Sequence, residues 1–335
     1  MLKKRFWGKE IDPYEGLDKK VLSNVCKAEI RKFKLPIMYW TSEIYSFGKA
    51  FREWLGIPKW LHLPFYSDHG YTPLRYLQSH ELNNSSNIHV TFNQYRYEKI
   101  KDIKSKKIIY LTNPYVHYRR IKNFQQNENA KGTLVFYTHS LYKVDLKDYN
   151  LNHHLHDLNS LPDKYKPIVF MFHYNDIKKG NHLEILKRGY PILTAGNQYS
   201  WNYFIDRFYD IICHFKYATS NSGGSDLMYC TEMGLEYFIL GKEPSHEYKG
   251  NNKERKKYFA KRNKKLNEID KKKRNLFHYE SQAGKKEKHD FIKKCLGLNT
   301  SVSKKTFKKL LMKEYIKTLP DYLKISSSKI IDKIS

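Results

Sequence analysis

The sequence predicts a mixed α/β fold built on parallel sheets, and two observations lead to this expectation. The chain has 335 residues, of which 40% are hydrophobic and 15% aromatic, enough for two domains that each bury an apolar core. Between residues 166 and 242, short apolar runs alternate with amphipathic segments of helix length. Strands that alternate with helices in this way imply right-handed βαβ crossovers and a parallel sheet.

This alternation is clearest in the second half of the chain and weaker in the first. In the second half, the expected strands lie at 168–172, 191–195, 215–218 and 235–240, and the expected helices at 181–188, 201–213 and 225–233. In the first half, strands are expected at 36–40, 60–64, 88–92, 108–112 and 134–137, and helices at 46–55, 73–82 and 115–123. Two Rossmann-like domains in tandem follow, with expected bounds of 1–155 and 156–250.

A strong positive charge marks the chain, and most of it lies in the tail. Lys and Arg number 62 against 34 Asp and Glu, a net charge of +28, and more than half of the excess falls within residues 251–335. Such an excess indicates a polyanionic partner: nucleic acid, an anionic membrane surface or a phosphorylated substrate. The 28 Tyr and 18 Phe are concentrated in apolar strands and helices, where they are expected in the core rather than stacked on bases. Nucleic-acid binding is therefore the less favoured class.

Residues 251–335 are predicted to form basic helices. Phe307, Leu310, Leu311 and Ile316 fall on one helical face, with lysines on the others. Such a helix can lie in the interface of an anionic membrane, or its apolar face can pack back onto the domains. The sequence has no secretory signal and no apolar run of the roughly 18 to 20 residues that a spanning helix needs. We expect a cytoplasmic protein, peripheral on the inner membrane face.

A turn rich in small residues follows the strand expected at 215–218 and opens the next helix. Hydroxyl side chains and backbone N–H groups at a helix N-terminus favour an anion such as a phosphate. Such residues are also the preferred caps of an ordinary β-to-α turn. Because ligands of open α/β sheets gather at the carboxyl ends of the strands, we expect a phosphate here. The residues of the turn are Thr219, Ser220, Asn221, Ser222 and Gly223.

Three residues that follow other strands are further candidates for ligand binding. His173 follows the strand at 168–172 and is expected to point into the same crevice as this turn, where it could donate to a phosphate or stabilise a leaving group. Gly196 follows the next strand and lets the backbone approach a ligand closely. Both also have structural alternatives, as a histidine packed beside a strand and as a tight turn. His139 ends the last strand of the first domain and is expected to face the cleft between the domains.

A candidate general base lies in the first half of the chain. Asp68-His69-Gly70 follows an apolar run, and either side chain could take a proton from a hydroxyl once its pKa is tuned. Glu81 lies one expected helix later and could support them. The structural alternative is an aspartate that caps a helix, with an incidental histidine beside it.

Several motifs are absent from the sequence. It contains neither GxxxxGK[ST] nor GxGxxG, which disfavours a P-loop NTPase and a dinucleotide oxidoreductase. No Asp-x-Asp is present to hold a metal-bound nucleotide, and the four cysteines form no CxxC pair. The histidines at 153–156 lack cysteine or carboxylate at ligand spacing and favour a helix start. We therefore expect a metal-independent transferase with no bound metal.

The turn at 219–224, the helix through Glu232-Met233-Gly234 and the strand that ends at Leu240-Gly241-Lys242 resemble the nucleotide-binding half of GT-B glycosyltransferases. In particular, they resemble bacterial enzymes of capsular and surface polysaccharides that use CMP-activated sialic acid, other nonulosonates or Kdo. The resemblance covers residues 134–242 well and the first domain loosely. It implies two Rossmann-like domains facing a cleft, with acceptor binding at 1–155, nucleotide-sugar binding at 156–250 and basic C-terminal helices after them.

The resemblance also implies roles for single residues. In bacterial sialyltransferases a Ser/Thr pair holds the CMP phosphate, a role that maps to Thr219, Ser220 and Ser222. The acidic-acidic-Gly base motif maps to Asp68-His69-Gly70, with histidine at its second position. The implied activity is inverting transfer of an acidic sugar from a CMP donor to a capsular or surface glycan, with no cofactor. A glycosyl- or glycerophosphotransferase with a UDP, GDP or CDP donor shares the phosphate turn and is the alternative.

Overall fold

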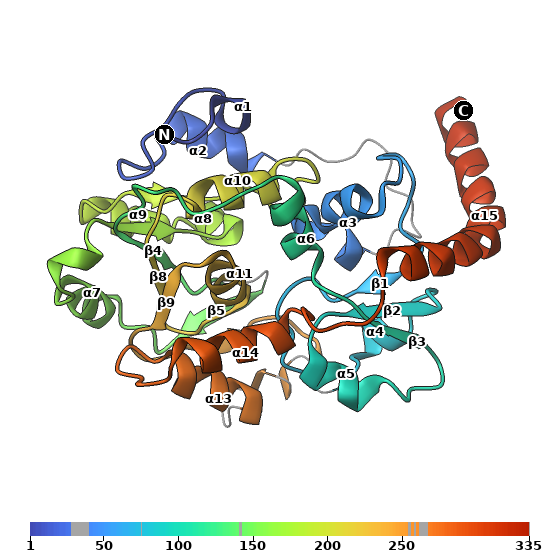
Figure 1. The fold of residues 1–335 in the computed structure, drawn as a ribbon. Coiled ribbons are helices and arrows are strands. Elements are labelled where there is room, and N and C mark those ends of the chain that lie inside the picture. The colour runs from blue at the N-terminus through green and yellow to red at the C-terminus, as the bar shows by residue number, and fades with distance from the viewer. Residues whose placement is uncertain are drawn as a thin grey trace. The chain divides into compact units, whose positions relative to one another are not determined.

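A computed structural model describes residues 1–27, 40–74, 76–140, 143–253, 256–257, 259–260 and 267–334 (Figure 1). The chain forms two compact units. Unit 1 comprises Met1–Ala28, Asn123–Asn197 and Tyr203–Ile292, and unit 2 comprises Glu29–Lys122, Gln198–Asn202 and Lys293–Ser335. Each unit contains a parallel sheet with helices, so the predicted mixed α/β fold is confirmed.

The units divide the chain at places other than those expected from the sequence. A boundary near residue 155 is expected, but β4 (Thr133–Phe136) pairs with β6 (Ile168–Met171) and β8 (Tyr217–Ser220) in unit 1. The N-terminal segment also packs in unit 1, because the indole Nε1 of Trp7 donates to the Asp210 carboxylate at 2.9 Å. Contacts between segments far apart in the chain determine these boundaries, and such contacts cannot be predicted from composition.

The main sheet of unit 1 has five parallel strands in the order β7-β6-β4-β8-β9. Val135 and Phe170 face one layer of the core together with Leu155 and Ile185 from the helices that cover it. Alternate residues of a strand point to opposite faces, and the ring of Phe136 accordingly contacts Phe208. The outer strands are β7 (Ile192–Leu193) and β9 (Glu236–Ile239). One face of the sheet is covered by α7 (Leu151–Asn159) and α9 (His182–Lys187), and the other by α10 (Phe204–Ile212). Helix α11 (Ser225–Met233) has the bounds that the sequence predicts.

The other elements of unit 1 frame this sheet. β5 (Val144–Lys147) and β10 (Ser245–Tyr248) form a two-stranded antiparallel sheet. The histidines at 153–156 lie in α7, which Asn150 caps, as the sequence predicts. The remaining helices in the described part of unit 1 are α1 (Lys4–Trp7), α2 (Lys19–Cys26), a 3-10 turn at Asp163–Tyr165, α8 (Tyr174–Lys179) and α13 (Glu268–Phe277). The chain passes into unit 2 within α14 (Lys285–Cys295).

Unit 2 contains a three-stranded parallel sheet in the order β1-β2-β3. Its strands are β1 (Tyr66–Ser67), β2 (Ile88–Thr91) and β3 (Lys107–Tyr110). Helices α3 (Phe47–Leu55) and α6 (Pro114–Ile121) pack together through rings such as Phe47 and Tyr115, whose centroids lie 4.8 Å apart. The other elements are 3-10 turns at Trp40–Ser42 and Ile44–Ser46, α4 (Ser79–Leu82), α5 (Gln94–Ile100) and α15 (Lys304–Ile334).

Three expectations for this part of the chain have different outcomes. The strand expected at 60–64 is wrong: the strand nearest to it is β1 at 66–67, and Pro64 has no N–H to donate to a ladder. The helix expected at 73–82 is present only as α4, which begins at the capping box of Gln78 and Glu81. The strand expected at 36–40 lies outside the described residues except at Trp40, which is in a 3-10 turn.

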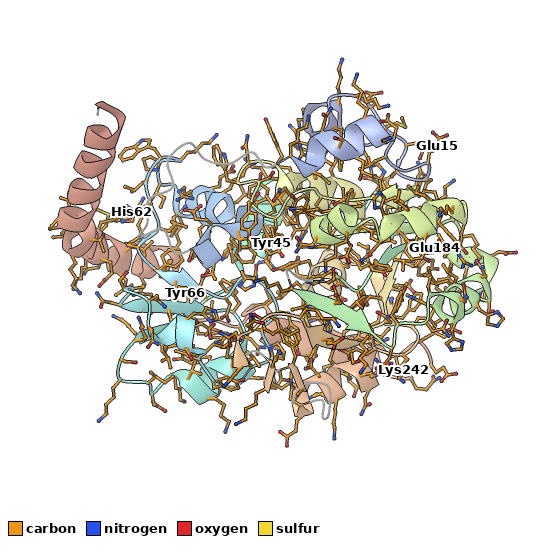
Figure 2. The ribbon with its side chains drawn as sticks, turned by 180° about the vertical axis from the view of Figure 1, so that it is seen from behind. Glu15, Tyr45, His62, Tyr66, Glu184 and Lys242 are labelled. Atoms are coloured by element: carbon orange, nitrogen blue, oxygen red, sulfur yellow. The ribbon has the colours of Figure 1, made fainter. Side chains whose placement is uncertain are left out.

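Helix α15 uses its predicted apolar face to pack within unit 2. Phe307 and Leu311 are fully buried, and the ring of Phe307 contacts Trp54 and Phe65 at centroid distances of 6.0 and 5.5 Å. The Tyr315 hydroxyl donates to the backbone carbonyl of the residue labelled His62 in Figure 2, at 2.6 Å. The expectation that Phe307 and Leu311 contact lipid is therefore wrong, because these side chains belong to the core. In the described part of the chain, no helix combines the length and hydrophobicity needed to cross a bilayer.

Candidate functional site

The carboxyl edge of the unit 1 sheet brings together most of the expected phosphate-binding segments. Because all five strands are parallel, the loops that follow them leave from the same edge. Thr138 and His139 follow β4, His173 follows β6, and Asn221 and Ser222 follow β8. The structure thus places residues from three separate segments of the chain at one edge of the sheet.

Hydrogen bonds of the Ser220 side chain hold the turn between β8 and α11 in its conformation. The Ser220 hydroxyl accepts hydrogen bonds from the backbone N–H of Gly223 at 2.7 Å and from the Tyr237 hydroxyl at 2.8 Å. Gly223 has φ +64°, and a Cβ there would come within 2.8 Å of the Leu227 side chain. Glycine is required because the turn needs both a left-handed residue and close packing onto the helix. Ser220 is therefore a structural element of the turn.

An acidic side chain also lies at this helix start. Asp226 accepts a hydrogen bond from the backbone N–H of Gly224 at 2.9 Å and another from the Tyr237 hydroxyl. Burial raises the pKa of the Asp226 carboxyl against the effect of these hydrogen bonds. A carboxylate at a helix N-terminus is favoured by the same field that favours a phosphate. The Asp226 side chain therefore already occupies part of the helix start that a phosphate would use.

Ser222 is the hydroxyl of the turn that stays partly exposed. Its Oγ lies 3.2 Å from the Thr138 hydroxyl, which also donates to the side-chain oxygen of the buried Asn221. The guanidinium of Arg274 donates to the backbone carbonyls of Asn221 and Gly241 at 3.2 and 2.6 Å. These contacts fix the backbone around Ser222. The contribution of Thr138 and Arg274 is not evident from the motif, because both lie far from the turn in the sequence.

Two imidazoles continue this polar edge. The ring centroids of His139 and His173 lie 4.8 Å apart. His139 is exposed, and His173 is half-buried as the cap of α8, where its Nδ1 accepts the backbone N–H of Asn175 at 3.2 Å. Imidazoles beside a hydroxyl and a helix start offer the donors that a phosphate needs.

Two expected ligand contacts do not fit the structure. The Thr219 hydroxyl is fully buried and donates to the backbone carbonyl of Phe238 at 2.8 Å, so it faces the next strand instead of a ligand. Gly196 has φ +93°, and a Cβ there would come within 2.3 Å of the Val25 carbonyl oxygen. The close backbone approach predicted for Gly196 is therefore made to α2, within unit 1.

In unit 2, the Asp68 carboxylate lies in a buried ion-pair network. One oxygen accepts from the Arg96 guanidinium at 2.7 Å, and the other from the Thr91 hydroxyl at 2.6 Å. A second nitrogen of Arg96 donates to Glu81 at 2.7 Å. Arg96 is fully buried, and Asp68 and Glu81 are 2% and 6% exposed. Arg96 is absent from the sequence expectations because the two acids and the arginine share no local motif.

This network argues against either carboxylate as the general base. Burial alone would raise the pKa of the Asp68 carboxyl, but the charge of Arg96 and the hydrogen bonds it accepts outweigh burial and hold its pKa below the usual range. A carboxylate of low pKa is a weak base. Glu81 also accepts the backbone N–H of Gln78 at 2.6 Å, which makes it the third helical residue of the capping box of α4. The geometry gives both acids a structural role.

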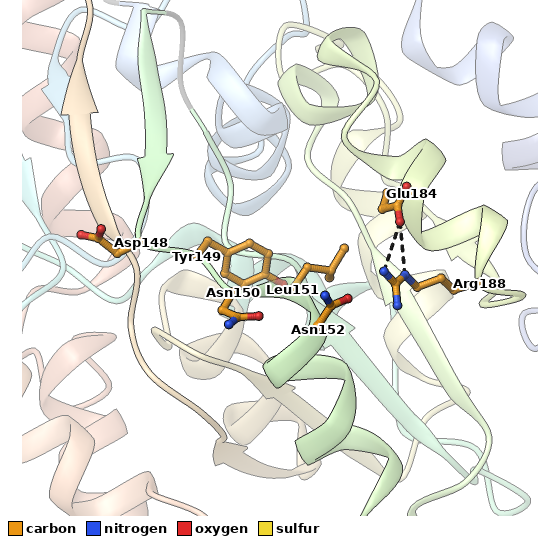
Figure 3. Close-up of a pocket in the computed structure, with 7 residues that line it drawn as sticks. All are labelled: Asp148, Tyr149, Asn150, Leu151, Asn152, Glu184 and Arg188. Carbon is orange, nitrogen blue, oxygen red and sulfur yellow. Dashed lines mark hydrogen bonds and ion pairs between the residues drawn. The ribbon is translucent and has the colours of Figure 1, made fainter.

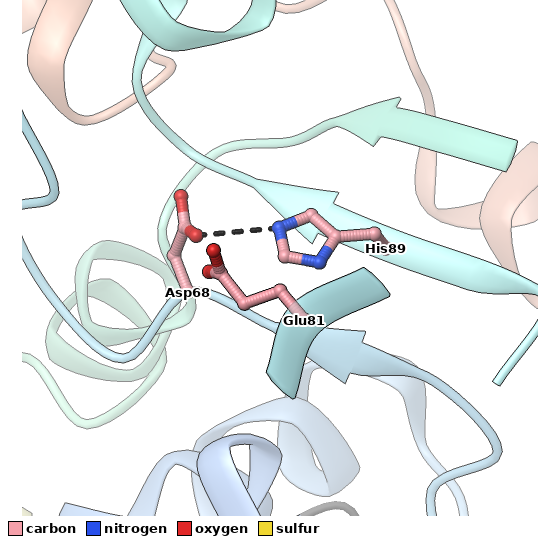
Figure 4. A group of neighbouring side chains, drawn as sticks. All are labelled: Asp68, Glu81 and His89. Atoms are coloured by element: carbon pink, nitrogen blue, oxygen red, sulfur yellow. Dashed lines mark ion pairs between the residues drawn. The ribbon is translucent and has the colours of Figure 1, made fainter. Parts of the chain in front are cut away.

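The same cluster is the one group of three potential metal ligands among the described residues. Ligand atoms of Asp68, Glu81 and His89 lie within 4.8 Å of one another, and Figure 4 shows the Glu81 carboxylate beside that of Asp68, which faces the imidazole. His89 Nε2 lies 3.4 Å from the Asp68 carboxylate. However, the Arg96 guanidinium already forms ion pairs with both acids, and a metal ion would have to displace it. The donor set therefore fits an arginine-centred ion pair better than a metal.

His69 differs from its neighbours because its side chain is exposed. Its ring is stacked on that of Tyr45, with a centroid distance of 6.3 Å and an interplanar angle of 10°. The surrounding protein removes part of the hydration of the imidazole and lowers the pKa of His69 below its ordinary value. The neutral form, which can accept a proton, is thus the dominant form at neutral pH. Of the three expected base candidates, His69 alone keeps a side chain accessible to a substrate.

A separate hollow of about 540 Å³ lies in unit 1 at the start of α7 (Figure 3). Its lining includes Asp148, Asn150, Glu184 and Arg188. Arg188 is paired with Glu184 at 3.2 Å, as the dashed lines in Figure 3 show. The two acids and the paired arginine do not suit a phosphate, so this hollow is distinct in chemistry from the edge at Ser222.

Comparison with known proteins finds structural likeness alone. No protein-family model and no curated protein matches the chain. Among solved structures, the wall teichoic acid polymerase TagF matches at 12% identity and a TM-score of 0.35, covering 76% of this chain and 68% of that one. A TagF variant soaked with CDPG matches at 11% identity and a TM-score of 0.34, covering 70% of this chain and 57% of that one. The chain thus spans little more than half of that TagF chain.

The buried network yields a prediction about stability. Replacing Asp68 with asparagine leaves the buried Arg96 charge poorly compensated, so we expect unit 2 to lose about 3–5 kcal/mol of stability. The folded-state pKa of Asp68 is lowered, so its stabilising contribution is present above the ordinary aspartate pKa of about 3.9 and is lost as the pH falls through the folded value. Denaturant unfolding followed by circular dichroism measures both effects.

Asp145→Asn is the matched control for this prediction. Its carboxylate pairs with Lys179 at 2.7 Å on the surface, where such a pair contributes about 0–1 kcal/mol. Equal stability of the Asp68→Asn variant and the native protein, with a selective loss of activity, would contradict the structural role and restore Asp68 as a base.

Proposed function

We propose that the chain is a transferase that binds the phosphate of a nucleotide-activated donor at the carboxyl edge of the unit 1 sheet. The observation that carries this proposal is that polar side chains follow three adjacent parallel strands at this edge. Ser222 contacts Thr138, and the next residue, His139, lies beside His173. A hydroxyl, two imidazoles and a helix start supply hydrogen-bond donors to phosphate oxygens without a metal ion. The resemblance of the turn to GT-B glycosyltransferases agrees with this use.

In this reaction the acceptor hydroxyl oxygen forms the new bond as the bond between the transferred group and the donor phosphate breaks. The nucleotide leaves with the electron pair, and the groups around Ser222 stabilise its phosphate. The acceptor proton passes to a general base, for which we propose the exposed His69. The transferred group is an acidic sugar if the donor is CMP-linked, and a sugar or glycerophosphate if the donor is linked to CDP, UDP or GDP.

We also propose that α15 lies on an anionic membrane through the apolar side chains that it leaves exposed. Met312, Ile316 and Leu319 are 51%, 73% and 52% exposed and lie one turn apart along the helix. Exposed lysines, among them Lys309 and Lys313, flank this stripe. Each lysine near an anionic surface contributes about 1 kcal/mol, and the apolar side chains enter the interface.

The donor proposal is tested by a thermal-shift panel of CMP, CDP, UDP and GDP with the full chain. The matching nucleotide at 100 times its Kd should add about 2.7 kcal/mol of stability. Ser222→Ala should weaken its binding about tenfold, because a hydrogen bond to a charged phosphate is lost. Ser160→Ala, on the exposed end of α7, is the control and should bind as the native protein does. If no nucleotide raises the melting temperature, the donor assignment is wrong.

The base proposal predicts a separate effect of His69. His69→Ala should leave nucleotide binding unchanged and lower the transfer rate by roughly 10²- to 10⁴-fold. Because the pKa of His69 is lowered, transfer should persist below pH 6.5 and fall only as the pH drops through the lowered value, where the imidazole becomes protonated. A pH–rate profile of kcat/KM measures this limb. An unchanged profile and rate in the variant would assign the base elsewhere.

The membrane proposal predicts that Ile316→Glu with Leu319→Glu abolishes sedimentation with vesicles that contain phosphatidylglycerol, while the melting temperature stays the same. The control is Leu183→Glu with Leu186→Glu, which adds the same charges at two exposed leucines of α9. This control should sediment almost as the native protein does. Equal sedimentation of the two double variants would rule out the α15 face.

A further inference from the structure

The hollow at the start of α7 contains none of the residues that we have assigned to the donor, the base or the membrane (Figure 3). One wall comes from residues 148–152, between β5 and the first turn of α7. The other comes from Glu184 in α9 and Arg188 directly after that helix. Both walls belong to unit 1. With a volume of about 540 Å³, the hollow is within the size range of small-ligand sites.

The charge of this lining differs from that of the whole chain. The chain has a net charge of +28, yet the described residues that line the hollow include no lysine. Glu184 and Arg188 form an ion pair at 3.2 Å, which largely cancels their charges. Asp148 then carries the remaining charge, on a single exposed carboxylate that water and salt screen. The lining therefore disfavours an anion and suits a neutral polar ligand.

Contacts within the fold hold the polar side chains of the first wall in place. The Asp148 carboxylate accepts a hydrogen bond from the Ser245 hydroxyl at 2.8 Å through one of its oxygens. The side-chain oxygen of Asn150 accepts the backbone N–H of His153 at 3.0 Å. Side chains that are already fixed lose little conformational entropy when a ligand binds.

These contacts leave hydrogen-bonding atoms for a ligand. In the part of the chain that the structure describes, the second oxygen of Asp148, the amide nitrogen of Asn150 and the side-chain amide of Asn152 have no hydrogen-bond partner. Carboxylates accept hydrogen bonds, guanidinium groups donate them, and amides do both. A hydroxyl group also donates and accepts, so a ligand with several hydroxyl groups can bond to every polar side chain of the hollow.

The apolar part of the lining is small. It consists of the half-buried Tyr149 and Leu151. The Tyr149 hydroxyl lies 2.9 Å from Nδ1 of the buried His154, which restrains the ring. An aromatic side chain can cover the apolar C–H face of a sugar ring. A peptide would bring apolar side chains of its own, for which two such residues offer little surface.

We propose that this hollow binds a neutral oligosaccharide. Its hydroxyl groups replace water at Asp148, at Asn152 and at the Glu184–Arg188 pair, and one sugar ring lies against the apolar part of the lining. This site is separate from the donor turn and does not depend on the proposed transferase activity.

The test is saturation-transfer NMR of the full chain with maltose, lactose and chitobiose, followed by titration to obtain Kd. Glucuronic acid and glucosamine are the negatively and positively charged counterparts. We expect at least one neutral disaccharide to bind, and to bind more tightly than both charged sugars. Binding of no neutral disaccharide, or tighter binding of either charged sugar, would overturn the proposal.

Asn152→Ala with Glu184→Ala should weaken binding of that disaccharide about tenfold, because hydrogen bonds from both walls are lost. Both side chains are exposed, so the melting temperature should stay close to that of the native protein. The matched control is Glu280→Ala with Gln282→Ala, which removes an exposed acid and an exposed amide elsewhere in unit 1. This control should bind the disaccharide as the native protein does.

Equal disaccharide affinity of the two double variants would place the sugar elsewhere and show that the proposal is wrong. Nucleotide binding by the Asn152/Glu184 variant should not change. Failure of the donor proposal would therefore leave the disaccharide result unaffected.

Discussion

The parallel alignment of the five strands in unit 1 is the constraint on which the proposed chemistry depends. Parallel strands leave the sheet at one edge, so loops separated by tens of residues in the chain deliver their side chains to the same place. His139, His173 and Ser222 follow strands that leave the sheet at one edge, because β4 pairs in parallel with both β6 and β8. An antiparallel sheet with the same residues would distribute them over two edges.

Much of this arrangement could be predicted from the sequence, because apolar runs and helical periodicity locate strands and helices in a fully buried parallel sheet. Helix α11 and strands β6 and β9 lie close to the expected ranges. The unit boundaries could not be predicted in this way. They depend on pairings such as Trp7 with Asp210, more than 200 residues apart, which leave no periodic signal.

The sequence could predict where polar residues gather but not which of them form hydrogen bonds or ion pairs within the protein. Thr219 and Ser220 have the residue types of a phosphate turn, yet their hydroxyls bond to Phe238 and Tyr237. Asp68 has the residue type of a base, yet its charge is held by Arg96. A buried polar group needs a hydrogen-bond partner within the protein, so some residues of a suitable type bond to the fold and not to a ligand. Exposure is the property that separates Ser222 and His69 from their neighbours.

The same reasoning applies to the basic tail. A helix buries only the part of its apolar surface that meets a partner, and α15 buries Phe307 and Leu311 because they meet the aromatic side chains of unit 2. Ile316 is left exposed by that choice. A lysine-rich helix docked on one side and apolar on another holds its exposed face in a fixed orientation on unit 2. Packing of the docked face thereby holds the side chains proposed to contact lipid in one orientation, which a free amphipathic peptide would not do.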